Sequence, residues 1–197
     1  MEYNIMYKAM GKMLDGIIKK EITDKKVRQK IHSEYKAVIL RASDIGADNK
    51  LLSSYGLAAY FIGMVRNTGL SNEENIRILE QGMRKSRLLK AFMGDSKHYF
   101  SEKNMESRRK WSKQTHERKY KNDWVVDVLE KTDDYEFGLD YTECGVCKLC
   151  RDEKCPELAK YLCSLDFMLV ELIGIGLKRT KTLAEGYDYC DFRFIKK

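Results

Sequence analysis

The chain has 197 residues and a formal net charge of +7, with 43% hydrophobic and 34% charged residues. This length suits one domain with a sizeable core, and the composition is ordinary for a folded soluble protein. No apolar run is long enough to span a bilayer, and the N-terminal stretch is typical of an amphipathic helix and not of a signal peptide. We therefore expect a cytoplasmic protein without membrane contact, whose cysteines are reduced thiols, metal ligands or catalytic groups.

Residues 1–121 predict a helical part. Apolar residues at helical spacing indicate a first helix over residues 3–20 and a second helix after Thr23, which can act as its N-cap. A third helix, over about residues 50–66, is apolar nearly all round, as is typical of a central, buried helix. The sequence LSNEE at residues 70–74 contains a capping box, which predicts the start of a fourth helix.

Lysine and arginine are densest in SRRKWSKQTHERKYK at residues 107–121, most of which lies on a helix predicted over residues 101–117. The first interpretation is a solvated helix face, and the alternative is a stripe that binds phosphate groups. We favour the solvated face and do not expect nucleic acid as a partner. His32 and His116 are typical of partly exposed polar residues, with a catalytic role as the alternative.

The periodicity changes from helix to strand at Asn122. Residues 144–155 are predicted as a short crossover, and a helix follows from Pro156 to about Ile173. A tight turn through Gly186 would join the last two strands. The strands themselves are predicted at residues 123–130, 135–141, 177–183 and 187–195.

These elements predict an α+β fold. Residues 1–121 would form a helical bundle, and residues 122–197 would form a β-β-α-β-β unit whose four strands make one antiparallel sheet. The helix of this unit would cover one face of the sheet, and the bundle would cover the remaining apolar surface. We expect the two parts to pack as one compact domain, and association into a homo-oligomer stays open.

Two pairs of residues in the C-terminal part could carry chemistry. Cys163 and Asp166 are three residues apart on the predicted helix, so they share a face beside its leucine stripe, where they can line a cavity. Alternation along the last strand puts Cys190 on the apolar face with two phenylalanines, and puts Asp191 and Arg193 on the opposite face. The alternatives are a Cys163 that only fills space in the core, and an Asp191 and Arg193 that only form ion pairs.

All six cysteines lie between residues 144 and 190, and four of them follow the pattern C-x2-C-x2-C-x4-C-P. This pattern is close to the bacterial ferredoxin run, but its last spacing is four residues instead of three, and the chain has no second set of cysteines. The same four thiols could hold zinc, or they could be incidental. A non-catalytic small-molecule- or metal-binding module (zinc or iron–sulfur) that uses the cluster from Cys144 to Cys155 is therefore the alternative to an enzyme.

Four short motifs carry a resemblance to a known family. They are YTECG at residues 141–145, LCSLD at 162–166, RTKTLAEG at 179–186 and CDFR at 190–193. Their combination resembles the L-2-amino-thiazoline-4-carboxylic acid hydrolase family over roughly residues 124–193. The resemblance implies a hydrolase that opens the ring of L-2-amino-thiazoline-4-carboxylate, or of a similar small anionic heterocycle, to N-carbamoyl-L-cysteine. It implies a small-molecule substrate, and we expect neither a cofactor nor a metal.

The implied reaction requires a carboxylate, a cation and a nucleophile. Asp166 or Asp191 would hold the amidine group or activate water, and an arginine would bind the substrate carboxylate. Cys163 is the preferred thiol, with Cys144 and Cys190 as alternatives. The predicted catalytic residues are Cys163, Asp166, Asp191 and Cys190, and the predicted substrate-binding residues are Cys144, Arg179, Thr182 and Arg193.

Overall fold

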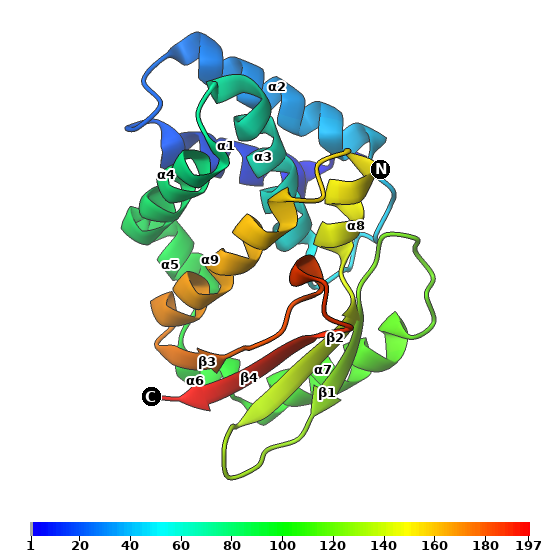
Figure 1. Cartoon of the computed structure of the whole chain (residues 1–197). Coiled ribbons are helices and arrows are strands. Elements are labelled where there is room, and N and C mark those ends of the chain that lie inside the picture. Colours follow the sequence, from blue (N-terminus) through cyan, green and yellow to red (C-terminus); the bar gives the residue numbers. More distant parts are fainter. Residues whose placement is uncertain (1) are drawn as a thin grey trace.

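The computed structural model describes residues 2–197, in which an N-terminal helical part precedes a C-terminal part that holds the sheet, and this confirms the predicted α+β fold (Figure 1). The helical part consists of α1 (Ile5–Ile18), α2 (Lys25–Arg41), α3 (Leu52–Thr68), α4 (Asn72–Lys85), α5 (Arg87–Met93), α6 (Ser96–Tyr99) and α7 (Glu102–Thr115). The C-terminal part consists of β1 (Val125–Leu129), β2 (Phe137–Glu143), α8 (Gly145–Asp152), α9 (Leu158–Leu172), β3 (Ile175–Lys178), the 3-10 turn η1 (Leu183–Glu185) and β4 (Cys190–Lys196).

Local signals determine where the helices begin. Ser71 and Glu74 form the predicted capping box of α4, in which each side chain accepts the backbone N–H of the other residue, at 3.2 and 3.0 Å. The predicted cap of α2 is wrong, because Asp24 and not Thr23 accepts the first backbone N–H groups of that helix. A carboxylate at this position can accept two N–H groups and also interacts favourably with the positive end of the helix dipole.

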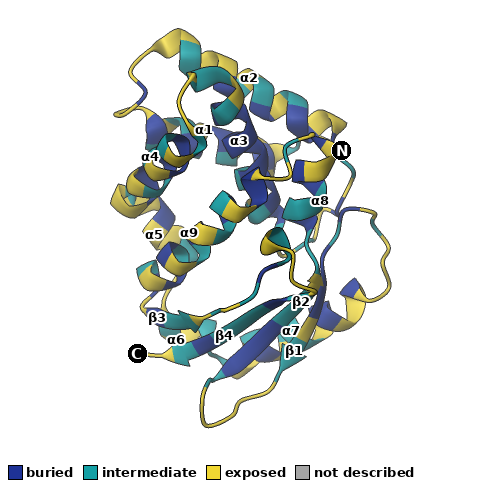
Figure 2. Ribbon diagram, in the orientation of Figure 1, coloured by how far each residue is buried: buried dark blue, intermediate teal, exposed yellow. Residues whose placement is uncertain are grey.

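The third helix, α3, is buried on nearly every side, as its all-round apolar sequence predicts (Figure 2). It packs against α2 along much of its length. A Cβ atom on Gly63 would lie 2.8 Å from the carbonyl oxygen of Ile31, so the two helices approach this closely only because Gly63 has no side chain. The same helix contacts α1, α4, α8 and α9, so it forms the centre of the helical part.

The sheet has the strand order β1-β2-β4-β3, and every neighbouring pair is antiparallel. Alternation gives it one apolar and one polar face. Phe137 and Tyr141 of β2 pair with Phe194 and Cys190 of β4, and these side chains belong to the face that the helices cover. The opposite face carries the ion pair between Arg193 and Asp140. The predicted assignment of Cys190, Phe192 and Phe194 to one face of the last strand is thus confirmed.

The predicted hairpin of residues 177–183 and 187–195 is wrong in its first arm. β3 ends at Lys178, and residues 179–189 form a loop that contains η1. The carboxylate of Asp191 accepts the backbone N–H groups of Thr180 and Lys181, at 2.8 and 2.5 Å. These bonds take the donors that a strand ladder would have used, so the loop replaces the strand despite its favourable residues.

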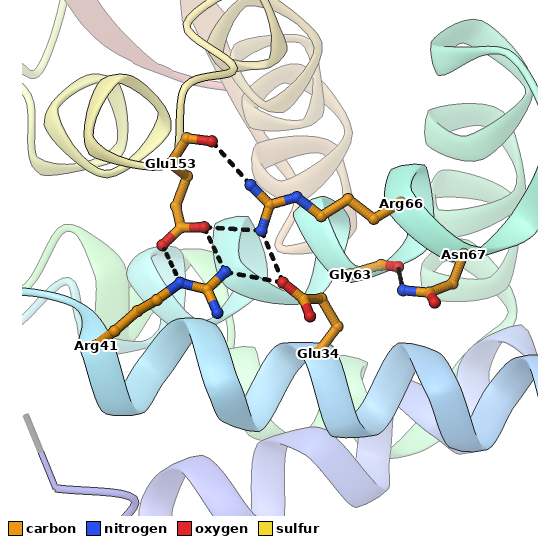
Figure 3. A network of polar contacts seen from close by, with 6 residues as sticks. All are labelled: Glu34, Arg41, Gly63, Arg66, Asn67 and Glu153. Carbon is orange, nitrogen blue, oxygen red and sulfur yellow. Dashed lines mark hydrogen bonds and ion pairs between the residues drawn. The ribbon is translucent and has the colours of Figure 1, made fainter.

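Residues 144–155, predicted as a short crossover, contain the helix α8. Its far end is held by an ion cluster around Glu153, whose side chain is only 6% exposed. Glu153 accepts from Arg41 of α2 at 2.5 and 2.7 Å and from Arg66 of α3 at 2.8 Å, and both arginines also bind Glu34 (Figure 3). This cluster fixes α8 against the two most closely packed helices of the bundle.

Two hydrophobic clusters form the core of the described residues. The larger cluster joins the helical part to α8 and α9 and includes Trp124, and the smaller one lies between the sheet and α7 and includes Trp111. Helix α9 contributes its first turns to the larger cluster, and its Val170 and its C-cap residue Ile173 belong to the smaller one. Figure 1 shows α9 between the bundle and the sheet. Within residues 2–197, no helix combines the length and the apolar character needed to cross a bilayer.

Candidate active site

A cavity of about 120 Å³ lies where α3, the start of α8, α9 and the end of the sheet meet. Cys144, Cys163, Asp166 and Cys190 all line it, although they lie on three separate segments of the chain. Pairing of Tyr141 with Cys190 places the end of β2, and hence Cys144, beside the first residue of β4. Helix α9 then adds Cys163 and Asp166 one turn apart, as the sequence spacing predicts.

Cys144 is the N-cap residue of α8, and the glycine after it allows the helix to start there. A Cβ atom on Gly145 would lie 2.5 Å from the carbonyl oxygen of Asn122 and 2.7 Å from the Trp124 ring. Any other residue would therefore displace the first turn of α8. The glycine of YTECG thus sets the position of the neighbouring thiol.

The three thiols of the cavity have different acidities. The pKa of the Cys144 thiol lies below its ordinary value, because the Cys147 thiol and the backbone amides of Cys147 and Val146 interact with its sulfur and outweigh burial. Burial and the nearby Asp166 raise the pKa of Cys163, and burial raises the pKa of Cys190 to about 11. Cys144, rather than the expected Cys163, is therefore the thiol whose surroundings favour a thiolate.

Asp166 is held at the cavity wall by Arg179. The guanidinium of Arg179 donates to Asp166 Oδ2 at 2.5 Å and to the carbonyl oxygen of Cys163 at 3.0 Å. Its carbon atom Cζ lies 4.9 and 5.0 Å from the ring centres of Phe167 and Phe192, so the guanidinium contacts both rings. Burial raises the pKa of Asp166 to about 6, although Arg179 opposes this shift.

The other four predicted residues lie outside the cavity wall. Arg179 is committed to Asp166, and Arg193 donates to Asp140 at 2.5 Å on the polar face of the sheet. Asp191 binds the loop amides described above, and Thr182 accepts the N–H of Glu185 as the cap of η1. These contacts stabilise the 179–189 loop and the sheet next to the cavity.

Ten further residues line the cavity that we did not predict as site residues, and Ser54, Trp124, Tyr141 and Phe192 are among them. Tyr141 belongs to the YTECG motif and lies on the same face of β2 as Phe137 and Leu139, which are buried. Strand alternation in the sequence could therefore have identified it as a residue that faces the site. Burial raises the pKa of Tyr141 well above its ordinary value, which keeps its hydroxyl protonated and able to donate. Ser54 carries no such signal, because α3 has the pattern of a core helix.

The four cysteines of the ferredoxin-like pattern do not come together as one set. Cys144 interacts with Cys147, and Cys150 interacts with Cys155. Among residues 2–197, no group of three or more histidine, cysteine, aspartate or glutamate side chains could hold a metal ion. The short helix α8 separates the thiols into two pairs.

A second, larger cavity of about 330 Å³ adjoins the first and shares Ser54, Leu57 and Leu169 with it. It lies between α1, α3 and the α4–α5 segment, and methionine side chains form much of its wall. Its lining is almost wholly apolar, in contrast to the thiols and the carboxylate of the first cavity.

Fold and cavity together define an α+β protein with a thiol- and carboxylate-lined site between a helical bundle and an antiparallel sheet. The family model described as L-2-amino-thiazoline-4-carboxylic acid hydrolase matches residues 52–194, and this range contains every cysteine and every predicted site residue. The chain therefore belongs to this hydrolase family, as its motifs indicated. No curated protein and no solved structure matches the chain.

Proposed function

We propose that the protein hydrolyses L-2-amino-thiazoline-4-carboxylate to N-carbamoyl-L-cysteine, and that it works in a reducing, cytoplasmic environment as an enzyme of cysteine metabolism. One observation carries the proposal: a chain of this family gathers Cys144, Cys163, Asp166 and Cys190 around one cavity. The cavity, at about 120 Å³, suits a single small heterocycle. The free cysteines agree with the reducing environment.

In the proposed reaction the Cys144 thiolate adds to the ring carbon that lies between two nitrogens and the sulfur. The ring carbon–sulfur bond breaks, the released sulfur takes a proton, and the carbon remains bound to Cys144 Sγ. Water then adds to this carbon, the bond to Cys144 breaks, and a urea group is left. One water is consumed and one substrate thiol is formed in each turnover.

Asp166 would accept hydrogen bonds from the amidine nitrogens and take or return the proton of the attacking water. Its pKa of about 6 suits a general base near neutral pH. Arg179 would act as a positioning residue, because its guanidinium holds the Asp166 carboxylate and does not line the cavity. Direct attack by water, with Asp166 as base, would give the same product without a bond to Cys144.

The test is release of thiol from L-2-amino-thiazoline-4-carboxylate, followed with a thiol-reactive dye after reductant has been removed. We expect release well beyond the protein's own cysteines. Cys144→Ser should lower turnover by at least about 100-fold if Cys144 forms the covalent bond. Cys155→Ser, which lies outside the cavity wall, is the matched control.

Two outcomes would contradict parts of the proposal. A folded Cys144→Ser variant with normal turnover would leave direct attack by water as the mechanism. A folded wild-type protein that binds the heterocycle without releasing thiol would be a binding module and not a hydrolase for this substrate.

A further inference from the structure

Two cysteines lie on the same turn at the start of α8. Cys144 is the N-cap residue and Cys147 is the third residue of the helix, so the sequence CGVC occupies the first turn. Residues three apart on one helical turn lie on the same side of the helix, so the side chains of Cys144 and Cys147 are neighbours. The Cys147 thiol interacts directly with the Cys144 sulfur, and both residues are partly exposed.

We propose that Cys144 and Cys147 form a dithiol site that exchanges with low-molecular-weight disulfides and closes to an internal disulfide. This activity is separate from ring hydrolysis. It needs only the two thiols, their position at a helix N-terminus and access for a small disulfide. A C-x-x-C pair at the start of a helix is the arrangement in which a thiolate is stabilised and a second thiol stands ready to displace the bound partner.

The exchange has two steps. The Cys144 thiolate attacks one sulfur of the small disulfide, which forms a mixed disulfide and releases one small thiol after protonation. The Cys147 thiol then loses its proton and attacks Cys144 Sγ, which releases the second small thiol. The protein dithiol is oxidised by two electrons, and one small disulfide is reduced to two thiols.

The other cysteines are less suited to this exchange. Cys150, which belongs to α8, is fully buried, although its neighbour Cys155 is partly exposed. Cys163 and Cys190 lie on separate elements, α9 and β4, and burial holds both in the thiol form. Cys144 alone joins an acidified thiol, a partner on the same helical turn and a place in the cavity wall.

The exchange would also regulate the proposed hydrolase, and this part rests on the function proposed above. The internal disulfide occupies Cys144 Sγ, so no thiolate is left to add to the ring carbon. Hydrolysis should therefore fall in proportion to the oxidised fraction and return when a dithiol reductant opens the disulfide.

Digestion with trypsin followed by mass spectrometry tests the proposal, because cleavage after lysine and arginine leaves Cys144 and Cys147 in one peptide and separates them from the other cysteines. Cys144 and Cys147 fall together in TDDYEFGLDYTECGVCK, residues 132–148, and each of the other four cysteines falls in a peptide of its own. Folded protein would be equilibrated with mixtures of reduced and oxidised glutathione, blocked with N-ethylmaleimide and digested. We expect peptide 132–148 to lose two hydrogen atoms and to carry no maleimide, before any cross-linked pair of peptides forms.

Variants separate the two steps. Cys147→Ser should trap glutathione on Cys144, because the thiol that displaces it is missing. Cys155→Ser should still form the internal disulfide of peptide 132–148. The proposal is overturned if both cysteines of this peptide react with maleimide while other cysteines are oxidised. It is also overturned if glutathione remains on Cys144 in the wild-type protein. The mass readout requires no hydrolysis, so its result is independent of whether the thiazoline is the substrate.

Discussion

At the scale of single residues, Asp166 links the cavity to pH. Its pKa is raised to about 6, so the carboxylate forms as pH rises through this value. If the charged form binds the amidine group or acts as base, kcat/KM should rise with pH and level off above about 6. Asp166→Asn should lower kcat/KM by about 100-fold and abolish this rise. A pH profile of the variant with the same slope as the wild type would assign the titration to another group.

Arg179 should shift that pH dependence without contacting the substrate. Its guanidinium lowers the pKa of Asp166 against the larger effect of burial. Arg179→Met should therefore raise the pKa of Asp166 further and move the rise of kcat/KM to higher pH. Arg193→Met is the matched control, because Arg193 pairs with Asp140 on the other face of the sheet. Equal midpoints in the two variants would show that Arg179 does not position Asp166.

At the scale of elements, the start of α8 depends on Gly145. In Gly145→Ala the new Cβ atom would meet the Asn122 carbonyl oxygen and the Trp124 ring. We expect a loss of about 1–3 kcal/mol in the free energy of unfolding, together with reduced activity, because the helix carries Cys144 with it. Gly16→Ala in α1 is the control: its Cβ would meet nothing within 4 Å, so this variant should gain about 0.5–1 kcal/mol. Denaturant titration measures the free energy of unfolding of both variants. Equal changes in Gly145→Ala and Gly16→Ala would contradict the role of Gly145.

The far end of α8 depends on Glu153. Burial raises the pKa of Glu153, but Arg41 and Arg66 outweigh burial, so its net pKa is lowered. A lowered folded-state pKa adds stability above the unfolded pKa of about 4.3, and this stability is lost as pH falls through the folded value. Glu153→Gln should lower the free energy of unfolding by about 1–3 kcal/mol at neutral pH, a loss that the partial exposure of both arginines keeps moderate. The loss should be smaller in acid, where Glu153 of the wild type is itself protonated. Glu171→Gln, in an exposed pair with Arg84, should change stability by less than about 1 kcal/mol.

Periodicity in the sequence predicted the parts of the site that depend on one element. Helical spacing placed Cys163 and Asp166 on one face of α9, and strand alternation placed Cys190 on the covered face of β4. It could not place Cys144 beside them, because that position depends on the β2–β4 register and on the first turn of α8. The prediction of a strand at residues 179–183 was wrong for a related reason. The Asp191 carboxylate binds the backbone N–H groups of Thr180 and Lys181, and the β propensity of single residues contains no information on such a contact.

At the scale of the whole molecule, the two hydrophobic clusters each contain one of the two tryptophans. Trp124 lies in the larger cluster and Trp111 in the smaller one, and both are nearly fully buried. Helix α9 contributes to both clusters, and Tyr141 packs against both. Neither cluster can lose its packing without exposing residues of the other, so we predict that the chain unfolds as one cooperative unit.

Trp111→Phe and Trp124→Phe leave one tryptophan each, and each remaining fluorophore reports on one cluster. Urea unfolding curves of the two variants, each compared with circular dichroism of the same sample, should have one coincident transition per variant. If the Trp111 signal changed at lower urea than the helical signal, the sheet would come away from the bundle first. The cavity, whose wall combines α3 and α9 with β2 and β4, would then open before the helices melt, and activity would disappear in the first of the two transitions. If fluorescence and circular dichroism instead change in a single transition, the cavity is lost only when the whole fold unfolds.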